Sequence, residues 1–525
     1  MRCARLAPLL LAAIVSLTGC ATSNNTGTGT GTGGATTPNA FSGQYAFLLS
    51  GFDSAGNPMG ISGSLKADGL GHITGGEADL NDNGMLSSDN ALAGTYAFDP
   101  DGQGALGSIS LTSTLGTPHG LTFGFSLQAT GAFGQIMSLD ANNFIAAGTM
   151  QLQSPSAFTF AGLAGDYIVT INGRNASRPT STLGRLSLGL TGATTNLAFD
   201  RSEAGVGTAT STSPIAMFGT TGPDANGRGT FTLTLNDTFG ITTQNFAYYV
   251  ISAKRLVAVE TDTTGTMTAD FSGQSTPFTA ATVVTPGSVF GIDGIDTAAA
   301  NNIVAVGQLQ ISAAPSTASF IWDSNDAGTV AGPVTLASQP AVFDPTTGRG
   351  TVTIANGTAN GLADNAVFYL TAPGTGFIMD ATAGVTNRAA AGTLTAQAAG
   401  PYSATADLGG LGIVRSRGSS VNNAFSLVGL FGLSTNLTNY SLLFDNRFPG
   451  SGGVITTQLD TTATGIGLQS LNGTTGRGIL TIPDGNSTET EAMYVIGPNQ
   501  FVFIDVSPVS SGANLASTLF FVNPH

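Results

Sequence analysis

Apolar and polar residues alternate along many short segments of the chain, the period of two that is typical of β-strands. The clearest segment is 231–235, where Phe231, Leu233 and Leu235 fall on one face and two threonines on the other. Successive side chains of a strand point to opposite faces, so such segments predict half-buried antiparallel strands. Clusters of Gly, Pro, Asn and Asp separate them, and no helical stripe is found after the N-terminal segment. The sequence therefore predicts an all-β protein.

The first part of this region contains the pattern of eight consecutive strands. We expect them at 43–52, 60–68, 71–79, 92–98, 104–113, 119–128, 132–140 and 144–153. Eight strands joined by short turns fit an up-and-down antiparallel barrel, whose closure leaves no open sheet edge. A two-sheet β-sandwich fits the same number of strands. Both architectures stay open at this point.

Three landmarks recur about every 120 residues, which indicates an internal repeat. The first is a glycine that opens a strand, at Gly43, Gly165, Gly287 and Gly400. The second is a Gly-x-Gly turn, at 102–104, 227–229, 348–350 and 476–478. The third is an apolar strand that ends in an acid, at Asp140, Glu260, Asp380 and Asp505. We predict four tandem antiparallel β-domains of about 120 residues, at 41–155, 156–280, 281–399 and 400–525.

The N-terminus has the layout of a cleaved export signal. Two arginines precede an apolar run at 6–15, which is too short to span a bilayer. The ending Leu17-Thr18-Gly19-Cys20 resembles the bacterial lipobox, and this resemblance implies diacylglycerol transfer to the Cys20 thiol and cleavage between Gly19 and Cys20. An ordinary signal peptide with an incidental cysteine is the alternative. We expect a lipoprotein signal peptide at 1–19, then the lipidated cysteine and a flexible Gly/Thr-rich tether at 20–40.

This anchor predicts where the protein resides and what it touches. The membrane is the expected partner through the lipid on Cys20, and the expected location is the cell envelope. Ala21 follows the cysteine in place of an aspartate, which favours the outer membrane over the inner one. Cys3 leaves with the signal and the chain has 2 cysteines, so the mature protein has no disulfide within it and no thiol chemistry apart from Cys20.

The composition narrows the range of partners. The net charge is −15, so nucleic acid is not an expected partner. Only 9% of the residues are charged and 73 are glycine, yet 41% are hydrophobic and 30 are phenylalanine, which argues for packed cores against disorder.

Residue patterns for catalysis are missing from the sequence. The 3 histidines, at 72, 119 and 525, share no metal-ligand spacing and suit neither a zinc site nor a Ser-His-Asp triad. No nucleotide-binding fingerprint follows a strand and opens a helix. We therefore expect a protein that is not an enzyme and has no cofactor.

Residues 79–84 match the first half of a calcium loop. Asp79, Asn81 and Asn83 would supply the alternating oxygen ligands of such a loop. Its twelfth position is Asn90 in place of a bidentate glutamate, and strands flank it in place of helices. We favour a hairpin turn that uses Asn83 and Gly84 for positive φ angles.

The strand-end acids and the Gly-x-Gly arginines each occur once per repeat. Glycoside hydrolysis needs two carboxylates in one cleft, so the single recurrent acid favours a role in capping turns. Arg228, Arg349 and Arg477 lie between glycines at hairpin tips, with Gln103 in the first repeat. One interpretation is a solvated tip, and the other is a row of cations that contacts carboxylated or sulfated polymers.

The run 67–77 and the preceding segment 45–53 resemble a group of uncharacterised acidobacterial-type tandem-repeat surface lipoproteins. The group has no known activity, so the resemblance implies export and repetition only. Our hypothesis is a non-catalytic binding, adhesion or structural module at the cell surface, with extracellular polysaccharide or a surface protein as partner. The alternatives are a carrier of small apolar ligands in the barrel interiors and an extracellular polysaccharide-active enzyme.

Overall fold

The structure is a computed structural model, which describes residues 41–525 apart from short segments. These segments are 54–55, 100–104, 114–120, 140–143, 176–177, 276–277, 279–286, 298–300, 314–315, 327, 383–386, 419–425, 434–438, 450–454, 485–486 and 508–517. Gly19, Cys20, Gln103 and Asp140 lie outside the described residues, so the predictions on them stay predictions.

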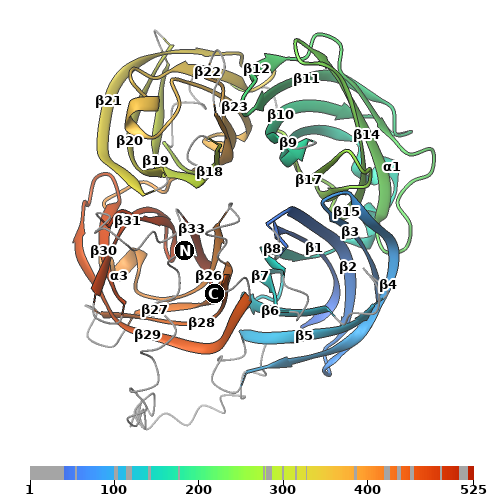
Figure 1. The fold of residues 1–525 in the computed structure, drawn as a ribbon, viewed down its shortest axis with the longest axis horizontal. Helices are drawn as coiled ribbons and strands as arrows, with labels where there is room; N and C mark the ends of the chain where they lie inside the picture. The colour runs from blue at the N-terminus through green and yellow to red at the C-terminus, as the bar shows by residue number, and fades with distance from the viewer. Residues whose placement is uncertain are drawn as a thin grey trace, which may run out of the picture.

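Four β-units follow one another along the chain, and we call them modules 1 to 4 (Figure 1). Module 1 contains β1 (Ser42–Phe52), β2 (Pro58–Asp68), β3 (His72–Asp82), β4 (Met85–Phe98), β5 (Leu106–Ser113), β6 (Leu121–Leu127), β7 (Phe133–Ser138) and β8 (Ile145–Leu152). Module 2 contains β9 (Gly165–Asn175), β10 (Arg178–Leu188), β11 (Thr194–Glu203), β12 (Gly207–Thr210), β13 (Ile215–Phe218), β14 (Arg228–Asp237), β15 (Gly240–Ser252), β16 (Arg255–Glu260) and β17 (Gly265–Gly273).

Modules 3 and 4 repeat the plan. Module 3 contains β18 (Ser288–Asp296), β19 (Asn301–Ala313), β20 (Ser316–Asp326), β21 (Thr329–Phe343), β22 (Arg349–Thr353), β23 (Asn365–Ala372), β24 (Thr375–Asp380) and β25 (Arg388–Ala396). Module 4 contains β26 (Leu411–Gly418), β27 (Ser426–Leu433), β28 (Asn439–Pro449), β29 (Ile455–Leu471), β30 (Arg477–Asp484), β31 (Ser487–Gly497), β32 (Gln500–Asp505) and β33 (Thr518–Pro524).

The all-β prediction is confirmed, and three of the four modules are closed eight-stranded barrels. In modules 1, 3 and 4 each strand pairs antiparallel with the next, and the last strand pairs with the first. Module 2 is a nine-stranded sheet whose edges are β12 and β13. The break between these two short strands contains Pro214, which has no amide hydrogen to donate to a ladder.

The alternation of apolar and polar residues predicts correctly which side chains are buried in the core. Phe231, Leu233 and Leu235 are buried inside module 2, whereas the threonines between them are more exposed. Each module has a separate interior cluster of this kind. The interiors are therefore filled by side chains of their own strands.

The four modules form a closed ring in chain order, with module 4 beside module 1 (Figure 1). At every junction the second strand of one module packs on the last three strands of the next. The pairs are β2 with β15, β16 and β17, β10 with β23, β24 and β25, β19 with β31, β32 and β33, and β27 with β6, β7 and β8. This shared packing gives the ring approximate four-fold symmetry. We call the junctions 1–2, 2–3, 3–4 and 4–1.

The prediction that a glycine opens the first strand of every repeat is only partly right. Gly43 and Gly165 occupy equivalent places in β1 and β9 and have φ angles of 115° and 151°, a conformation that favours glycine. Ser288 pairs with Leu309 as Tyr45 pairs with Leu65, so Gly287 is one residue out of register. Gly400 precedes a single-turn helix, α3 (Ala404–Asp407), and β26 starts later.

Helical structure is confined to single turns in the described residues. They are α1 (Phe160–Leu163), α3, η2 (Pro155–Ala157) and η3 (Thr358–Asn360). Thr159 and Ser403 cap α1 and α3 by accepting hydrogen bonds from backbone amides. In this part of the chain no helix has the length and apolar character needed to cross a membrane.

Candidate functional site

The arginines that sequence analysis singled out lie at the junctions between modules. Arg228 starts β14 of module 2 and reaches Asp79 on β3 of module 1, with Nε 2.8 Å from Oδ2 and Nη2 2.8 Å from Oδ1. Tyr249 on β15 pairs with Arg228 across the sheet and donates its hydroxyl to Asp79 Oδ2 at 2.6 Å. We call this arrangement of aspartate, arginine and tyrosine the carboxylate clamp.

The clamp recurs at the next two junctions with nearly the same geometry. Arg349 and Tyr369 of module 3 bind Asp200 on β11 at 2.8 Å in all three hydrogen bonds. Arg477 and Tyr494 of module 4 bind Asp323 on β20 at 2.7 Å in all three. A bidentate guanidinium fixes both the distance and the direction between two modules.

Burial and charge make each clamp a strong polar contact. The aspartate side chains are 1% to 2% exposed, and those of the arginines are 19% to 32% exposed. Hydrogen bonds to the carboxylates raise the pKa of each of the three arginines, which keeps them charged. Burial raises the pKa of each of the three tyrosines, which keeps their hydroxyls protonated as donors.

The polymer-contact interpretation of Arg228, Arg349 and Arg477 is therefore wrong, and so is the solvated tip. Each guanidinium is already held by a buried carboxylate of the preceding module. Freeing one for a ligand would leave that carboxylate buried without its partner, at a cost of about 3–5 kcal/mol.

A glutamine in each linker adds a second repeated contact. Gln153 follows β8, and its Nε2 donates to the carbonyl of Val250 at 2.5 Å and to that of Asn226 at 3.1 Å in module 2. Two more linker glutamines make the same pair of bonds: Gln274 to Leu370 (2.7 Å) and Thr347 (2.8 Å), and Gln397 to Val495 (2.6 Å) and Thr475 (3.0 Å). Each glutamine joins the end of one barrel to a turn and a strand of the next.

Junction 4–1 has the same packing without the clamp. The residues of module 1 that pair as Arg228 and Tyr249 do are Leu106 and Ser126. The second landmark is thus displaced in the first repeat, where Leu106 and not Gln103 takes the arginine position. Asp445 on β28 takes the aspartate position and is 3% exposed.

Apolar contacts lie at junction 4–1 where the other three junctions have the clamp. Leu106, Met137 and Ala147 of module 1 pack with Ile413, Val428 and Leu430 of module 4. A Cβ atom on Gly124 would lie 3.0 Å from Asp445 Oδ2, so a glycine lets β6 approach the buried carboxylate. We call this junction the seam.

The hairpin turn predicted at 79–84 is confirmed, and the side chains of the alternative calcium loop have other partners. Asp79 is occupied by the clamp, and it also accepts from the amide of Asp89 at 3.0 Å. Asn81 Nδ2 donates to the carbonyls of Glu260 and Gly265, and its Oδ1 accepts from Gly84. Asn83 turns the chain with a φ of 49°. Within the described residues no group of three or more His, Cys, Asp or Glu side chains could hold a metal ion.

Two of the strand-end acids cap turns as predicted. Asp380 accepts from the amide of Thr382 at 2.8 Å, and Asp505 accepts from that of Ser507 at 2.7 Å. Glu260 differs, because both of its carboxyl oxygens are buried without a hydrogen bond. Burial, and then the charge of Asp262, raise the pKa of Glu260 to about 9.

The partners of the arginines were not predicted from the sequence. The clamp aspartates, the clamp tyrosines and the linker glutamines each recur about every 120 residues, as the arginines do. That shared period was the available signal. No protein-family model matches the chain, and no curated protein is similar to it in sequence.

Proposed function

We propose that this protein is an exported, lipid-anchored, non-catalytic component of the cell envelope. In this proposal Cys20 holds it in the outer membrane, residues 20–40 act as a tether, and the ring is a rigid binding, adhesion or structural unit. The observation that carries the proposal is the repeated clamp. A chain with 9% charged residues uses three arginines and three buried aspartates to fix neighbouring modules to each other.

Rigidity supports a scaffold more than a set of independent binding domains. Separate domains on flexible linkers can each meet a ligand, whereas clamped modules present one surface with fixed spacing. The linker glutamines strengthen this argument, since they leave little freedom between consecutive barrels. The partner therefore meets the ring as a whole.

The alternative of an apolar carrier has less support. Side chains of the barrels occupy the described interiors. In module 3 a cavity of about 20 Å³ lies among Phe290, Ile303 and Phe320. This is about the room that one water molecule needs.

Fractionation of cells that express the full chain tests the anchor. We expect the wild type in the outer-membrane fraction, with the mass of a diacylglycerol on its N-terminal cysteine. The Cys20→Ser variant should keep its signal peptide and lack the lipid. A wild-type protein that carries no lipid would contradict the anchor, whatever the ring binds.

Binding of the whole ring to envelope material tests the second half of the proposal. The mature chain is passed over immobilised envelope polysaccharides and over outer-membrane extracts. We expect retention by wild type and reduced retention by an Asp200→Ala variant, in which one clamp is lost. Equal retention of both would contradict a role for the fixed spacing.

A further inference from the structure

The start of β1 marks the point where the predicted tether enters the ring. Phe41 is fully buried at this point and packs against Tyr45 and Tyr96, with ring centroids 4.7 Å and 4.9 Å away. Its carbonyl accepts from the Tyr96 hydroxyl at 3.0 Å and from the amide of Gly69 at 3.2 Å. The entry point is therefore fixed in module 1, beside the turn between β2 and β3.

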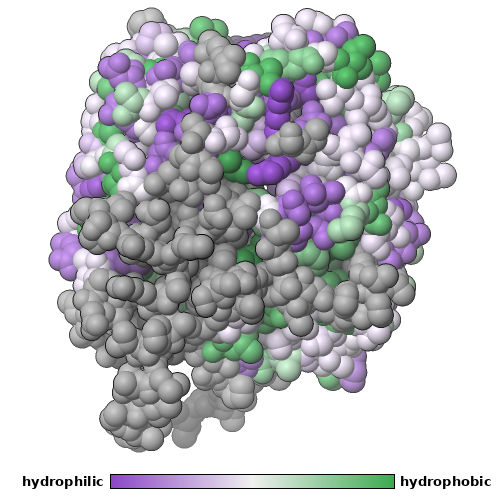
Figure 2. All heavy atoms as spheres, in the orientation of Figure 1, coloured by the Kyte–Doolittle hydropathy of each residue, from purple (hydrophilic) through white to green (hydrophobic). Residues whose placement is uncertain are grey.

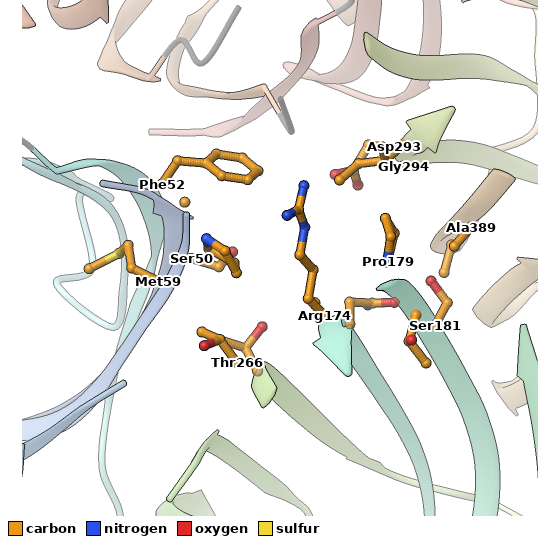
Figure 3. A pocket seen from close by; sticks show the side chains of 18 residues that line it. Ser50, Phe52, Met59, Arg174, Pro179, Ser181, Thr266, Asp293, Gly294 and Ala389 are labelled. Atoms are coloured by element: carbon orange, nitrogen blue, oxygen red, sulfur yellow. The ribbon is translucent and has the colours of Figure 1, made fainter. Parts of the chain in front are cut away.

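The two ends of each barrel lie toward opposite faces of the ring. Figure 1 looks down the shortest axis of the molecule and shows each module as a rounded outline, so the barrels are seen mostly end-on. The last residues of β1, β9 and β18, which we call the inner ends, meet around a small cavity where Figure 3 labels Phe52 and Arg174. The starts of β1 and β9, at Ser42 and Gly165, lie a whole strand away from it. We call the face that contains these starts the tether face.

The repeated packing of the modules places their corresponding ends on one face. The same contact between the second strand of one module and the last three strands of the next occurs at all four junctions. A contact of this head-to-tail kind that closes into a ring is a rotation about the ring axis. The turn between β2 and β3 and the turn between β10 and β11 therefore both lie on the tether face.

Each of these two turns projects a leucine. Leu70 is 82% exposed at the tip of the first turn, and Leu190 is 70% exposed at the tip of the second. Hydrogen bonds brace both tips, since Asp68 accepts from the amide of Leu70 at 2.7 Å and the amide of Gly189 donates to the carbonyl of Ala193 at 2.7 Å. A single exposed leucine is ordinary, but two on corresponding turns beside the tether indicate a common apolar partner.

The charges of the tether face are mixed. The chain has 2 lysines, Lys66 near the end of β2 and Lys254 in the turn before β16, and both are exposed at this end of their modules. Asp68 and Asp224 lie at the same end. The apolar tips therefore distinguish the face more than its net charge does. On the described part of the face that Figure 2 shows, hydrophobic residues lie in small groups among hydrophilic ones, and contact through single projecting side chains suits such a surface.

We propose that the tether face rests on the lipid bilayer, with Leu70 and Leu190 inserted among the lipids at the membrane surface. The inference rests on the proposed anchor, because a lipid on Cys20 confines the ring to the membrane. Residues 20–40 have an expected reach of about 25 Å, which keeps the tips near the bilayer at a high effective concentration. Exposed apolar side chains at that distance gain free energy by leaving water. The opposite face of the ring is then turned toward a partner.

Tryptophan reporters test which face meets the bilayer. The mature chain is coupled through its Cys20 thiol to a maleimide lipid in phosphatidylcholine vesicles, with or without bromine on the acyl chains. Leu70→Trp and Leu190→Trp each place a reporter on the tether face. Ile241→Trp is the matched control, because Ile241 is 74% exposed near the start of β15, a strand length away from that face. The native Trp322 is buried in module 3 and gives the same background in every variant.

We expect brominated lipids to quench the reporters at 70 and 190 at least about twofold more than the reporter at 241. Equal quenching at all three positions, or none at 70 and 190, would overturn the proposal. Chemical coupling separates this test from that of the anchor. A wild-type chain that carries no lipid in cells contradicts the anchor, whereas the coupled chain still decides whether the leucines contact lipid.

A second measurement asks whether the two leucines act together. In the Leu190→Trp chain, the further change Leu70→Ser removes one of the two apolar contacts and should lower the quenching at 190 at least about twofold. Ile241→Ser in the same chain should leave the quenching unchanged. Native circular dichroism of each variant shows that the ring is folded. Quenching that Leu70→Ser does not change would refute the joint contact.

Discussion

The three clamped junctions and the seam share one packing geometry and differ in chemistry. A linker crosses each clamped junction, and a buried ion pair with a tyrosine fixes its orientation. No linker crosses the seam, and Leu106 and Ser126 stand where the arginine and tyrosine would be. The difference teaches that two modules can lie side by side in this packing without the clamp. The ion pair adds a defined register to junctions that the chain already tethers.

Removing the aspartate from one clamp should cause the largest loss of stability among the variants that compare the clamped junctions with the seam. Asp200→Ala leaves Arg349 and Tyr369 in a partly buried junction without their acceptor. We expect a loss of about 3–5 kcal/mol in the free energy of unfolding. Urea denaturation followed by circular dichroism measures it, and Trp322 fluorescence reports module 3. His72→Ala removes an exposed hydrogen-bonded pair with Asp68 as a control and should change the free energy of unfolding little.

The seam should depend on apolar volume instead. Leu106 is fully buried at the seam, so Leu106→Ala should leave a cavity and cost about 2–4 kcal/mol. The same urea experiment measures this loss, with the partly exposed Leu86→Ala as control. A loss below about 1 kcal/mol would mean that the seam contributes little to the ring.

Junction 1–2 adds a dependence on pH, through Glu260. Its pKa of about 9 in the folded protein lies above its usual value of 4.5, so the folded state binds more protons between these values. The contribution of Glu260 to the free energy of unfolding is then fully present below about pH 4.5. It falls by at least about 2 kcal/mol as the pH rises toward 9. Glu260→Gln should reduce this fall, measured as unfolding free energy at several pH values. An identical pH profile in the variant would mean that Glu260 does not cause the pH dependence.

Removing one hydroxyl group at a clamp and one at the seam gives two variants whose losses of stability can be compared directly. Tyr369→Phe removes a hydrogen bond to a buried carboxylate and should cost about 1.5 kcal/mol. Ser126 Oγ is buried at the seam without a hydrogen bond, so Ser126→Ala should cost nothing or stabilise slightly. Thermal unfolding of the two variants compares them directly. Equal losses would mean that the two junctions do not differ in this way.

The smallest effect should come from replacing a whole clamp. In the triple variant Asp200→Leu, Arg349→Met and Tyr369→Phe, no clamp charge stays buried and apolar side chains replace the clamp. We expect a change of less than about 1 kcal/mol, because apolar replacements of buried ion pairs are often neutral. Small-angle scattering then tests whether the ring keeps its shape. A distorted ring with unchanged stability would mean that the clamp sets the orientation of the modules and contributes little to their stability.

Local patterns predicted the barrels well, because alternation and turn residues act over a few positions. The eight strands expected in module 1 all occur, and β4 starts earlier than expected, at Met85. The clamp could not be read in this way, since Arg228 and Asp79 are 149 residues apart in the chain. The inner ends of β1, β9 and β18 give even less signal, because Phe52, Arg174 and Ile295 take equivalent places there and differ in type.

Closure of the ring has a consequence for how the chain reaches its final state. Gln128 of module 1 donates to the carbonyl of Pro524, 396 residues later, at 2.8 Å. Ribosomes make the N-terminus first, so the apolar flank of module 1 stays bare until the last strands are complete. During that interval the fourth module of a neighbouring chain can dock on the same flank, and the outcome would be a domain-swapped oligomer.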